Sequence, residues 1–380
     1  MKTRLFDYHL PPEMIAQRPL PRREDSRMMV LRRSGRTSED SRFERIADYL
    51  RPGDLLVINN SRVIKARLRG IRAATGGKIE VFLVRRWDGE AGESSSTGAH
   101  GVSPAGAQAS RGGGTVWLAL TKSGGRLRVG EKLVLGGGML SATLLRRLGE
   151  EGDIVEFDAD SSKFDAIVKQ IGEAPIPPYI RRGPDKEDEE RYQTVYAREA
   201  GSVAAPTAGL HFSDEMLRKL REAGIGTAEV TLHVGPGTFK PVKSEEVKDH
   251  EVGSEFYAAG EETVKAIRRT RQAGGRIVAV GTTSLRVIET LARRGAFDET
   301  SARTRWEGMT DLFVYPPFEF AITDALLTNF HLPKSSLLML VCAFASPGRT
   351  DGIEWVLDRY EHAKKEGYRF YSYGDCMLIL

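Results

Sequence analysis

The residues most able to do chemistry gather around His211, at the end of the segment 201–212, which reads GSVAAPTAGLHF. Small residues packed this densely let a main chain approach a ligand closely. The segment runs into an expected helix, and the N–H groups at a helix start lack internal partners and favour a carboxylate or phosphate. A tight loop packed for structural reasons, with His211 as a hydrogen-bonded scaffold residue, explains the same pattern. The segment therefore indicates a site without establishing one.

Two further loops have a similar character. In 231–239 (TLHVGPGTF), Gly235 and Gly237 keep side chains away from whatever faces His233, although a structural hairpin explains the pattern nearly as well. In 280–286 (VGTTSLR), a buried strand ends in a turn of glycine and hydroxyl residues that opens a helix. This is the usual geometry for binding an anion or a ribose at the carboxyl end of a strand, although an ordinary capped helix start looks alike. The junction matches neither the P-loop nor the dinucleotide-binding glycine pattern.

The sequence contains no spacing typical of a metal site or a hydrolase. His250 and His331 stand in unusual settings, DHEVGSE and TNFHLP, but no His-x-x-x-His or Cys-x-x-Cys is present, so metal ligands would have to come from distant segments. Cys342 and Cys376 are too few for a disulfide framework and suit a reducing cytoplasm. No order of Ser, His and Asp supports a catalytic triad. We therefore expect no metal.

Length and hydropathy bound the class of protein. The 380 residues have room for two or three domains of roughly 100–200 residues each, and 40% apolar residues exclude wholesale disorder. The start of the chain has no apolar run followed by a cleavage site. The longest apolar run, 337–345, is far shorter than the ~20 residues that span a bilayer. These features predict a cytoplasmic protein that does not cross a membrane.

The net charge of +4 is modest, but its distribution is uneven. The first 36 residues contain nine Lys or Arg against four Asp or Glu, and the stretch 62–72 has no acid at all. Alternation within that stretch places Lys65, Arg67 and Arg69 on one face of an expected strand. Basic stripes of this kind can track a phosphate backbone, although a solvated surface is the commoner explanation.

The elements fall into two groups along the chain. Between residues 54 and 157 we expect short strands separated by glycine turns, at 54–59, 63–69, 78–85, 115–120, 126–129, 132–135 and 153–157. This pattern is typical of a small β-barrel or sandwich. The stretch 88–114 is rich in Gly, Ser and Ala and predicts a disordered surface loop.

From about residue 160 the pattern becomes mixed α/β. Ser213 is expected to cap a helix through Ala223, and further helices are expected at 261–273, 284–294, within 330–347 and at 352–365. Strands are expected at 228–233, 276–280 and 370–380. We predict an α/β main domain with an inserted small all-β barrel, the α/β domain formed by 1–61 and 158–380 and the barrel by 62–157.

Taken together, these segments resemble the S-adenosylmethionine:tRNA ribosyltransferase-isomerase family of queuosine biosynthesis. The segment 201–212 is highly specific to that family, and the match covers nearly the whole chain apart from 88–114. The other matching segments are 6–11 (FDYHLP), 15–17, 25–27, 59–63 (NNSRV), 175–180 (PIPPYI), 192–197 (YQTVYA), 232–242, 281–286, 328–340 and 368–379. One departure stands at Val252 and Gly253, where the family usually carries Met and often a second histidine.

The resemblance implies a β-barrel inserted into an α/β domain, and it implies the reaction. The ribosyl group of S-adenosylmethionine would move to the aminomethyl group of 7-aminomethyl-7-deazaguanine at the tRNA wobble position. The product would be epoxyqueuosine, with adenine and methionine released. S-adenosylmethionine would be consumed as a substrate, with no further cofactor, and the partners would be S-adenosylmethionine and that tRNA, with the chain a monomer in the simplest case.

The mechanism needs a base, a donor for departing adenine and a neutral amine. We hypothesise that His211 and His233 transfer protons, because each adjoins a loop of small residues, and that Glu255 or Asp7 complements the sulfonium or orients a histidine. The candidates for binding S-adenosylmethionine or the deazaguanine are Thr207, Gly209, Gly235, Gly237, Gly281, Thr282, Thr283, Arg286 and His331. The candidates for the tRNA backbone are Arg27, Lys65, Arg67 and Arg69.

Two other classes compete with this hypothesis. A methyltransferase also uses S-adenosylmethionine, but no strand here leads into the glycine-rich loop of the commonest type. A non-enzymatic RNA-binding module would explain the basic stretch 62–72, yet it leaves the loops 201–212 and 281–286 without purpose. The stretch 62–72 also lacks the aromatic residues that base-stacking modules place between basic ones.

Overall fold

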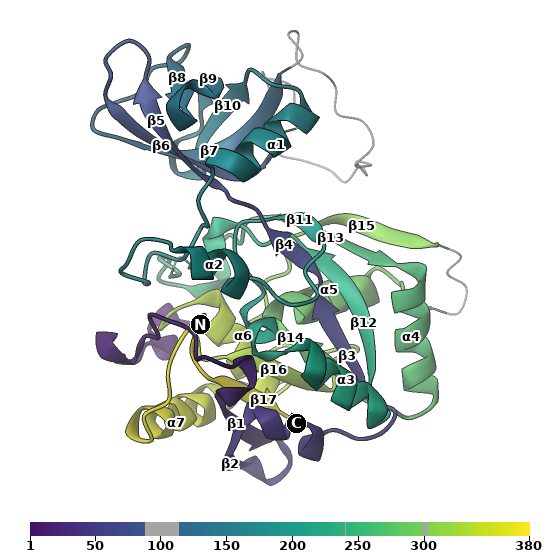
Figure 1. Cartoon of the computed structure of the whole chain (residues 1–380). Coiled ribbons are helices and arrows are strands. Elements are labelled where there is room, and N and C mark those ends of the chain that lie inside the picture. Colours follow the sequence, from purple (N-terminus) through teal and green to yellow (C-terminus); the bar gives the residue numbers. More distant parts are fainter. Residues whose placement is uncertain (88–113, 240, 299–302) are drawn as a thin grey trace. The chain divides into compact units, whose positions relative to one another are not determined.

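The computed structural model describes residues 1–87, 114–239, 241–298 and 303–380 (Figure 1). The chain forms two compact units: unit 1 contains Met1–Arg62 and Ile176–Leu380, and unit 2 contains Val63–Pro175. The predicted fold class, an α/β domain with an inserted β-barrel, is confirmed. The expected disordered loop at 88–114 lies outside the described residues except for Gly114.

Unit 2 is a closed antiparallel barrel, whose strands follow each other around it in the order β10-β7-β6-β5-β8-β9. Side chains of a strand point alternately into and out of the barrel, and Ile79, Val81 and Leu83 of β6 are buried in its interior. The strands are β5 (Arg67–Arg72), β6 (Lys78–Arg86), β7 (Thr115–Ser123), β8 (Lys132–Leu135), β9 (Leu140–Arg147) and β10 (Asp153–Phe157).

Helix α1 (Ser161–Ile171) also belongs to unit 2. Asp160 caps it by accepting from the N–H groups of its first turn, and Phe164 packs its ring on Phe157 at 4.8 Å and on Trp117 at 5.5 Å between centroids. This packing explains why the compact unit continues past residue 157, where we expected the module to end.

Two sequence predictions for unit 2 are wrong. The segment 126–129 is not a strand, because the chain turns at Gly130 (φ +82°) and the N–H of Arg128 donates to the Glu131 carboxylate at 2.9 Å. The strand expected at 63–69 starts only at Arg67, so Lys65 precedes it. Strand β9 and helix α1 were not expected from the sequence.

Unit 1 is built on a mixed sheet whose nine described strands run in the order β15-β13-β12-β3-β14-β16-β17-β1-β2. The neighbours β12, β3, β14 and β16 are parallel, whereas β17 runs antiparallel to β16. The strands are β1 (Arg27–Arg32), β2 (Thr37–Arg42), β3 (Leu55–Asn59), β12 (Gly226–Leu232), β13 (Glu255–Gly260), β14 (Ile277–Val280), β15 (Arg305–Thr310), β16 (Ala325–Asn329) and β17 (Cys376–Ile379). Strands β4 (Ser61–Val63) and β11 (Glu199–Ser202) form a separate pair.

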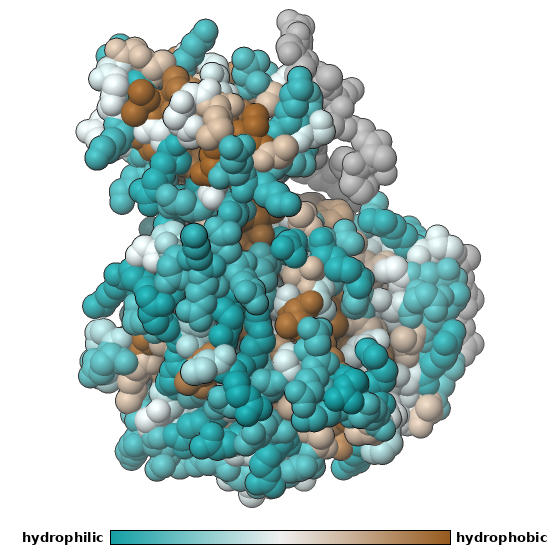
Figure 2. All heavy atoms as spheres, in the orientation of Figure 1, coloured by the Kyte–Doolittle hydropathy of each residue, from teal (hydrophilic) through white to brown (hydrophobic). Residues whose placement is uncertain are grey.

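Both faces of this sheet are covered. Alternate residues of β3 enter different cores: Leu55 and Val57 pack with α4, α5, α6 and α7, whereas Leu56 and Ile58 pack with α3 and the turn Phe43–Tyr49. The helices are α2 (Lys186–Arg191), α3 (Asp214–Glu222), α4 (Glu261–Gln272), α5 (Gly281–Arg293), α6 (Ser336–Ala345) and α7 (Gly352–Lys365). The face of the molecule in Figure 2 is covered mainly by hydrophilic residues, as expected when the apolar side chains fill such cores.

Most predicted elements of unit 1 are confirmed. Ser213 caps α3 by accepting from the N–H of Met216 at 3.0 Å, and α7 has the predicted bounds. Helix α5 begins at Gly281 and not at Ser284. The last strand is shorter than 370–380, because the chain turns at Tyr371 (φ +72°) before β17.

Within the described residues, no helix is both long and apolar enough to span a membrane.

Candidate functional site

The carboxyl ends of four parallel strands meet at one edge of the sheet in unit 1. Register pairs Val230 with Asn59, Ala279 with Val57 and Val280 with Leu327, so β12, β3, β14 and β16 end side by side. The segments that follow these strands are therefore neighbours, although long stretches of chain separate them. Ligands of open α/β sheets bind at such an edge.

An open pocket lies at this edge and encloses about 630 Å³, solvent at its mouth included. Among the described residues, none that lines the pocket is Asp, Glu, Lys or Arg. The lining residues are Tyr179, 204–208, Val234, 281–283, 328–332, Ser335, Leu337, Tyr371 and Ser372.

Two helices begin at this pocket. Gly281, Thr282 and Thr283 form the first turn of α5, and Ser335 caps α6 by accepting from the N–H of Leu338 at 3.2 Å. Gly281 has φ +88°, which a glycine adopts without strain. Because the unpaired N–H groups of a helix start favour negative charge, the pocket is suited to a carboxylate.

The structure brings together five of the predicted binding residues: Thr207, Gly281, Thr282, Thr283 and His331 all line the pocket. Within the described part of the chain, the hydroxyl oxygen of Thr283 is buried without a hydrogen-bond partner. An unpartnered buried hydroxyl is costly unless a ligand or water satisfies it.

His331 is a buried wall of this pocket. Its Nε2 lies 2.8 Å from the hydroxyl of Thr328, and its main-chain N–H donates to the phenol of Tyr360 at 3.1 Å. Burial lowers the pKa of His331 to about 3, so the ring is neutral at physiological pH.

His211 is held on both sides of its ring. Nδ1 lies 2.9 Å from the hydroxyl of Ser26, and Nε2 lies 3.2 Å from Nδ2 of Asn329. The same amide nitrogen lies 3.2 Å and 3.4 Å from the carbonyl oxygens of Tyr371 and Asp375, which can only accept. Nδ2 of Asn329 is therefore a donor, so Nε2 of His211 accepts and the imidazole proton sits on Nδ1.

Burial, and then the charges of Arg23 and Arg369, lower the pKa of His211 to about 3. His211 does not line the large pocket. It lines a smaller neighbouring pocket on the far side of its own turn, Thr207–His211.

His233 follows the end of β12 and directly precedes Val234, which lines the large pocket. Its ring stacks on Phe256 with centroids 5.5 Å apart, and burial lowers its pKa to about 4. Nδ1 is buried and has no partner among the described residues.

The glycine that makes room for His233 is Gly201. A Cβ there would lie 2.6 Å from Nε2 of His233. We expected Gly235 and Gly237 to serve that purpose, but a Cβ on Gly235 would approach Glu255 at 3.7 Å, and Gly237 faces open space.

Glu255 and Arg286 form a buried ion pair outside the large pocket. The other carboxylate oxygen of Glu255 accepts from the N–H of Gly235 at 2.7 Å, and Nε of Arg286 donates to the carbonyl of Leu312 at 3.0 Å. The pair therefore connects α5 and β13 to the loop that follows His233.

The remaining predicted residues of unit 1 lie apart from the pocket. Asp7 is exposed and pairs with Lys334 at 2.9 Å. Gly209 packs against the ring of Tyr196, where a side chain would collide. The guanidinium of Arg27 lies 4.0 Å above the ring of Tyr368.

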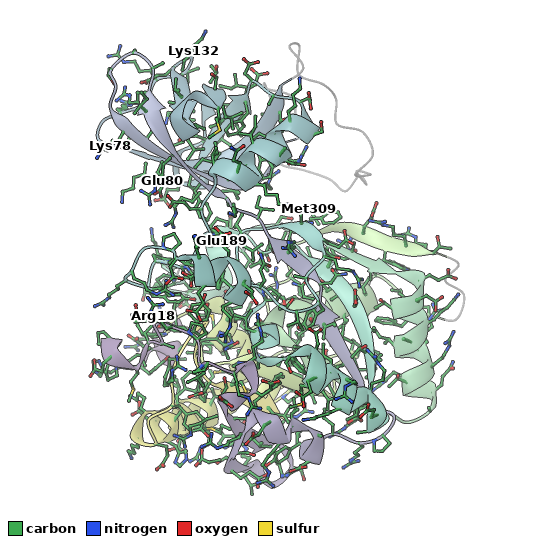
Figure 3. All side chains as sticks on the ribbon, viewed as in Figure 1. Arg18, Lys78, Glu80, Lys132, Glu189 and Met309 are labelled. Atoms are coloured by element: carbon green, nitrogen blue, oxygen red, sulfur yellow. The ribbon has the colours of Figure 1, made fainter. Side chains whose placement is uncertain are left out.

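The basic face of unit 2 is largely neutralised by acids from outside the stretch 62–72. Arg69 binds Glu173 at 2.8 Å, and Glu80 of β6, labelled in Figure 3, lies 3.8 Å from Arg67 and 3.7 Å from Arg69. The sequence showed a stretch without acids, but cross-strand pairing supplies them. Lys65 lies before β5 and is partly buried.

Sequence reasoning missed several pocket residues, chiefly Tyr179, Thr328, Asn329, Ser335, Tyr371 and Ser372. All six lie within segments that carry the family resemblance, at 175–180, 328–340 and 368–379. The signals available were the serine before the apolar run 337–345, which is a helix cap, and the polar pair Thr328-Asn329 at the end of a buried strand.

Within the described residues, no group of three or more His, Cys, Asp or Glu is arranged to hold a metal ion. At the position where the chain departs from the family pattern, Gly253 is exposed and a Cβ there would meet no atom within 4 Å. His250 contacts Phe313 edge-on, with centroids 5.4 Å apart.

Comparisons with known proteins agree with the resemblance. The family model described as queuosine biosynthesis protein matches residues 3–379. The S-adenosylmethionine:tRNA ribosyltransferase-isomerases of Pelobacter propionicus and Moorella thermoacetica are 47% and 44% identical to this chain, and each match covers 100% of both chains. The crystal structure of an S-adenosylmethionine tRNA ribosyltransferase from Thermotoga maritima matches with a TM-score of 0.51 and 38% identity, over 99% of this chain and 100% of that one. The chain therefore belongs to the S-adenosylmethionine:tRNA ribosyltransferase-isomerase family of queuosine biosynthesis enzymes.

Proposed function

We propose that the large pocket of unit 1 is where this enzyme transfers and isomerises the ribosyl group of S-adenosylmethionine. The acceptor is the aminomethyl group of 7-aminomethyl-7-deazaguanine at the tRNA wobble position. The products are epoxyqueuosine-tRNA, adenine and methionine. The observation that carries the proposal is an uncharged pocket at the carboxyl ends of parallel strands, into which two helix starts open.

The pocket offers a partner for each end of the donor. The first turn of α5, with Thr282 and Thr283, suits the methionine carboxylate. The rings of Tyr179 and Tyr371, with centroids 4.7 Å apart, and that of Phe330 suit the sulfonium through cation–π attraction. We assign the sulfonium to these rings and not to Glu255 or Asp7, because both carboxylates already have cationic partners.

The first chemical step moves a proton within the site. Removing it from C5′ next to the sulfonium turns that cation into a neutral ylide, and the neutral base that takes the proton becomes the cation. The number of positive charges in the site therefore stays the same. Opening of the ribose then expels adenine, the substrate amine attacks, and epoxide closure expels methionine.

We assign the proton transfer to His233 and a positioning role to His211. Both rings are neutral, which a base requires, but both nitrogens of His211 are already occupied by Ser26 and Asn329. Nδ1 of His233 is unpartnered within the described residues, and its neighbour Val234 lines the pocket. Glu255 orients His233 indirectly, through the N–H of Gly235.

Each bond change in this scheme is heterolytic and the donor's own sulfonium supplies the activation, so we propose that no metal or redox cofactor takes part. Because every residue that we assign to the site comes from one chain, we also propose that the chain acts as a monomer. Arg27, Lys65, Arg67 and Arg69 remain candidates for the RNA backbone. Dialysis against EDTA should leave the rate within two-fold, and a larger loss restored by a metal ion would overturn the metal-free scheme.

The direct test incubates the enzyme with S-adenosylmethionine and an anticodon stem-loop that carries the aminomethyl deazaguanine. Chromatography with mass detection should show adenine and methionine released in equal amounts, together with the epoxyqueuosine nucleoside. The appearance of S-adenosylhomocysteine, or the absence of adenine, would refute the proposed reaction. A His233→Gln variant that still works at the wild-type rate would remove only the assignment of the base.

A further inference from the structure

A second pocket, of about 280 Å³ with the solvent at its mouth, adjoins the first in unit 1. The turn Thr207–His211 separates the two, since Thr207 lines the first and His211 the second. Ser372 lines both. We propose that this second pocket binds a phosphodiester group of the RNA substrate.

The lining of the second pocket is strongly cationic. It contains Arg22, Arg23 and Arg191, and within the described residues no Asp or Glu lines it. The first pocket, by contrast, has no charged lining residue in the described part of the chain. Two adjoining pockets of such different character are suited to two different chemical groups.

The protein neutralises the arginines of the pocket only in part. Arg23 donates to the carbonyls of Leu210 at 3.1 Å and Glu190 at 3.3 Å, and no ion pair of Arg23 is found among the described residues. Arg191 also donates to main-chain carbonyls, at 2.7 Å and 3.1 Å, and its nearest carboxylate, Glu187, lies 3.7 Å away. These carbonyl contacts fix the guanidinium groups of Arg23 and Arg191 in place without neutralising them, and the ion pairs of Arg191 and of Arg22, with Asp25 at 3.8 Å, are long.

The positive charges also oppose each other. Burial lowers the pKa of Arg23, and the charge of Arg191 lowers it further. Nε of Arg191 is buried and has no partner within the described residues. Holding like charges together in a partly buried site is costly, and a bound anion would remove the cost. Guanidinium groups are well suited to phosphate oxygens.

A neutral donor completes the site. Because Nδ1 of His211 donates to the Ser26 oxygen, the hydroxyl proton of Ser26 is left to donate elsewhere, and Ser26 lines the second pocket. An anion bound here would therefore contact the residue that holds His211. It would also offset the positive charge of Arg23 that acts on the ring.

The assignment to RNA rests on the proposed function. Adenine and methionine carry no phosphate, so within that reaction only the RNA brings phosphate groups to the enzyme. A nucleotide whose modified base reaches the first pocket carries its backbone alongside, and a pocket one turn away can receive that backbone. Free phosphate has the same chemistry, and the test separates the two sources.

The test measures the affinity of the anticodon stem-loop for wild type, Arg22→Gln and Arg23→Lys, as a function of salt. Arg22 is 68% exposed and lies 3.8 Å from Asp25, so its removal should not disturb folding. Arg45→Gln is the matched control, because Arg45 is 62% exposed and pairs with Asp48 at the same i,i+3 spacing outside the pocket. We expect Arg22→Gln to weaken binding by roughly 3–10-fold and to lower the salt slope by about 0.7–0.9, the effect of one phosphate contact. The control should match wild type.

A second arm identifies the anion. We would compare stem-loops that each carry one neutral methylphosphonate linkage, placed at a different position near the modified base. Wild type should bind one of these RNAs more weakly than the others. Arg22→Gln should bind that RNA and the unmodified stem-loop equally well. Unchanged RNA affinity and salt slope in both arginine variants would overturn the proposal. The proposal would also be overturned if Arg22→Gln lost affinity for inorganic phosphate but kept its affinity for the stem-loop, because the pocket would then bind a free anion. Adenine release by the wild-type enzyme is measured in parallel. It tests the proposed reaction independently of whether the second pocket binds phosphate.

Discussion

The hydroxyl of Ser26 lies 2.9 Å from Nδ1 of His211, although 185 positions separate the two residues. Ser26 directly precedes β1 and His211 ends a turn that follows a loop of small residues. The sheet brings them together, because the start of β1 pairs with the start of β17, and β17 starts where β16 ends. This contact gives the Nδ1 proton of His211 an acceptor and holds the ring in the wall of the second pocket.

Ser26→Ala should leave the Nδ1 proton of His211 buried without an acceptor. An unsatisfied buried donor costs about 1–3 kcal/mol, so we expect that loss in the free energy of unfolding and a fall in kcat of about ten-fold. Ser26→Thr keeps the hydroxyl and should recover both. Urea denaturation and adenine release measure the two effects, and a Ser26→Ala enzyme with wild-type kcat would show that the position of His211 is unimportant for turnover.

His233→Gln should lower kcat by about 10²–10⁴-fold, the usual contribution of a positioned acid–base group, and leave KM for S-adenosylmethionine within a few-fold. The ring is only partly buried, so the variant should fold. The matched control is His9→Gln, because His9 is exposed and does not line either pocket. It should retain the wild-type rate.

Gly201→Ala should displace the ring of His233, because the added Cβ would lie 2.6 Å from Nε2. We expect kcat to fall at least ten-fold. Gly53→Ala is the control for backbone strain, since Gly53 has φ +92° and open space around its Cβ position. That variant should be about 1 kcal/mol less stable than wild type and should keep full activity at saturating substrate. Equal activity of the two variants would contradict a ring-displacement effect.

Glu255→Gln should leave the buried charge of Arg286 without its carboxylate. The two side chains are 11% and 10% exposed, and breaking a buried pair from one side costs about 3–5 kcal/mol. The double variant Glu255→Leu with Arg286→Met should recover most of that stability, because an apolar replacement of both partners removes the unpaired charge. Chemical denaturation at pH 7 measures both. If Glu255→Gln were as stable as wild type, the ion pair between Glu255 and Arg286 would have to be exposed to solvent.

Stability should fall as the pH drops below 6.5. The pKa of His211 and that of His331 are lowered to about 3, so the unfolded chain takes up protons between pH 6.5 and 3 while the folded chain does not. At pH 5 each ring should cost about 2 kcal/mol relative to neutral pH. His331→Asn should reduce the loss between pH 7 and 5 by that amount, whereas His9→Asn should leave it unchanged. An unaltered pH dependence in His331→Asn would mean that the ring is not buried as described.

The sequence by itself determined the local elements and the family. A serine followed by an amphipathic run predicted α3, an amphipathic pattern predicted α7, and short apolar segments separated by glycine turns predicted strands β7, β8 and β10. The small-residue segment 201–212 was specific enough to indicate the reaction. These features are readable because capping and hydrophobic period act between residues close in the chain.

Only the tertiary structure decided which of those segments share a site. Strand order places Gly281 beside His331 and leaves Arg286 outside the pocket, paired with Glu255. The fold also pairs Arg69 with Glu173, and nothing in the stretch 62–72 predicts that partner. Such contacts depend on sheet order and register between residues tens to hundreds of positions apart, and local propensity carries no information about them.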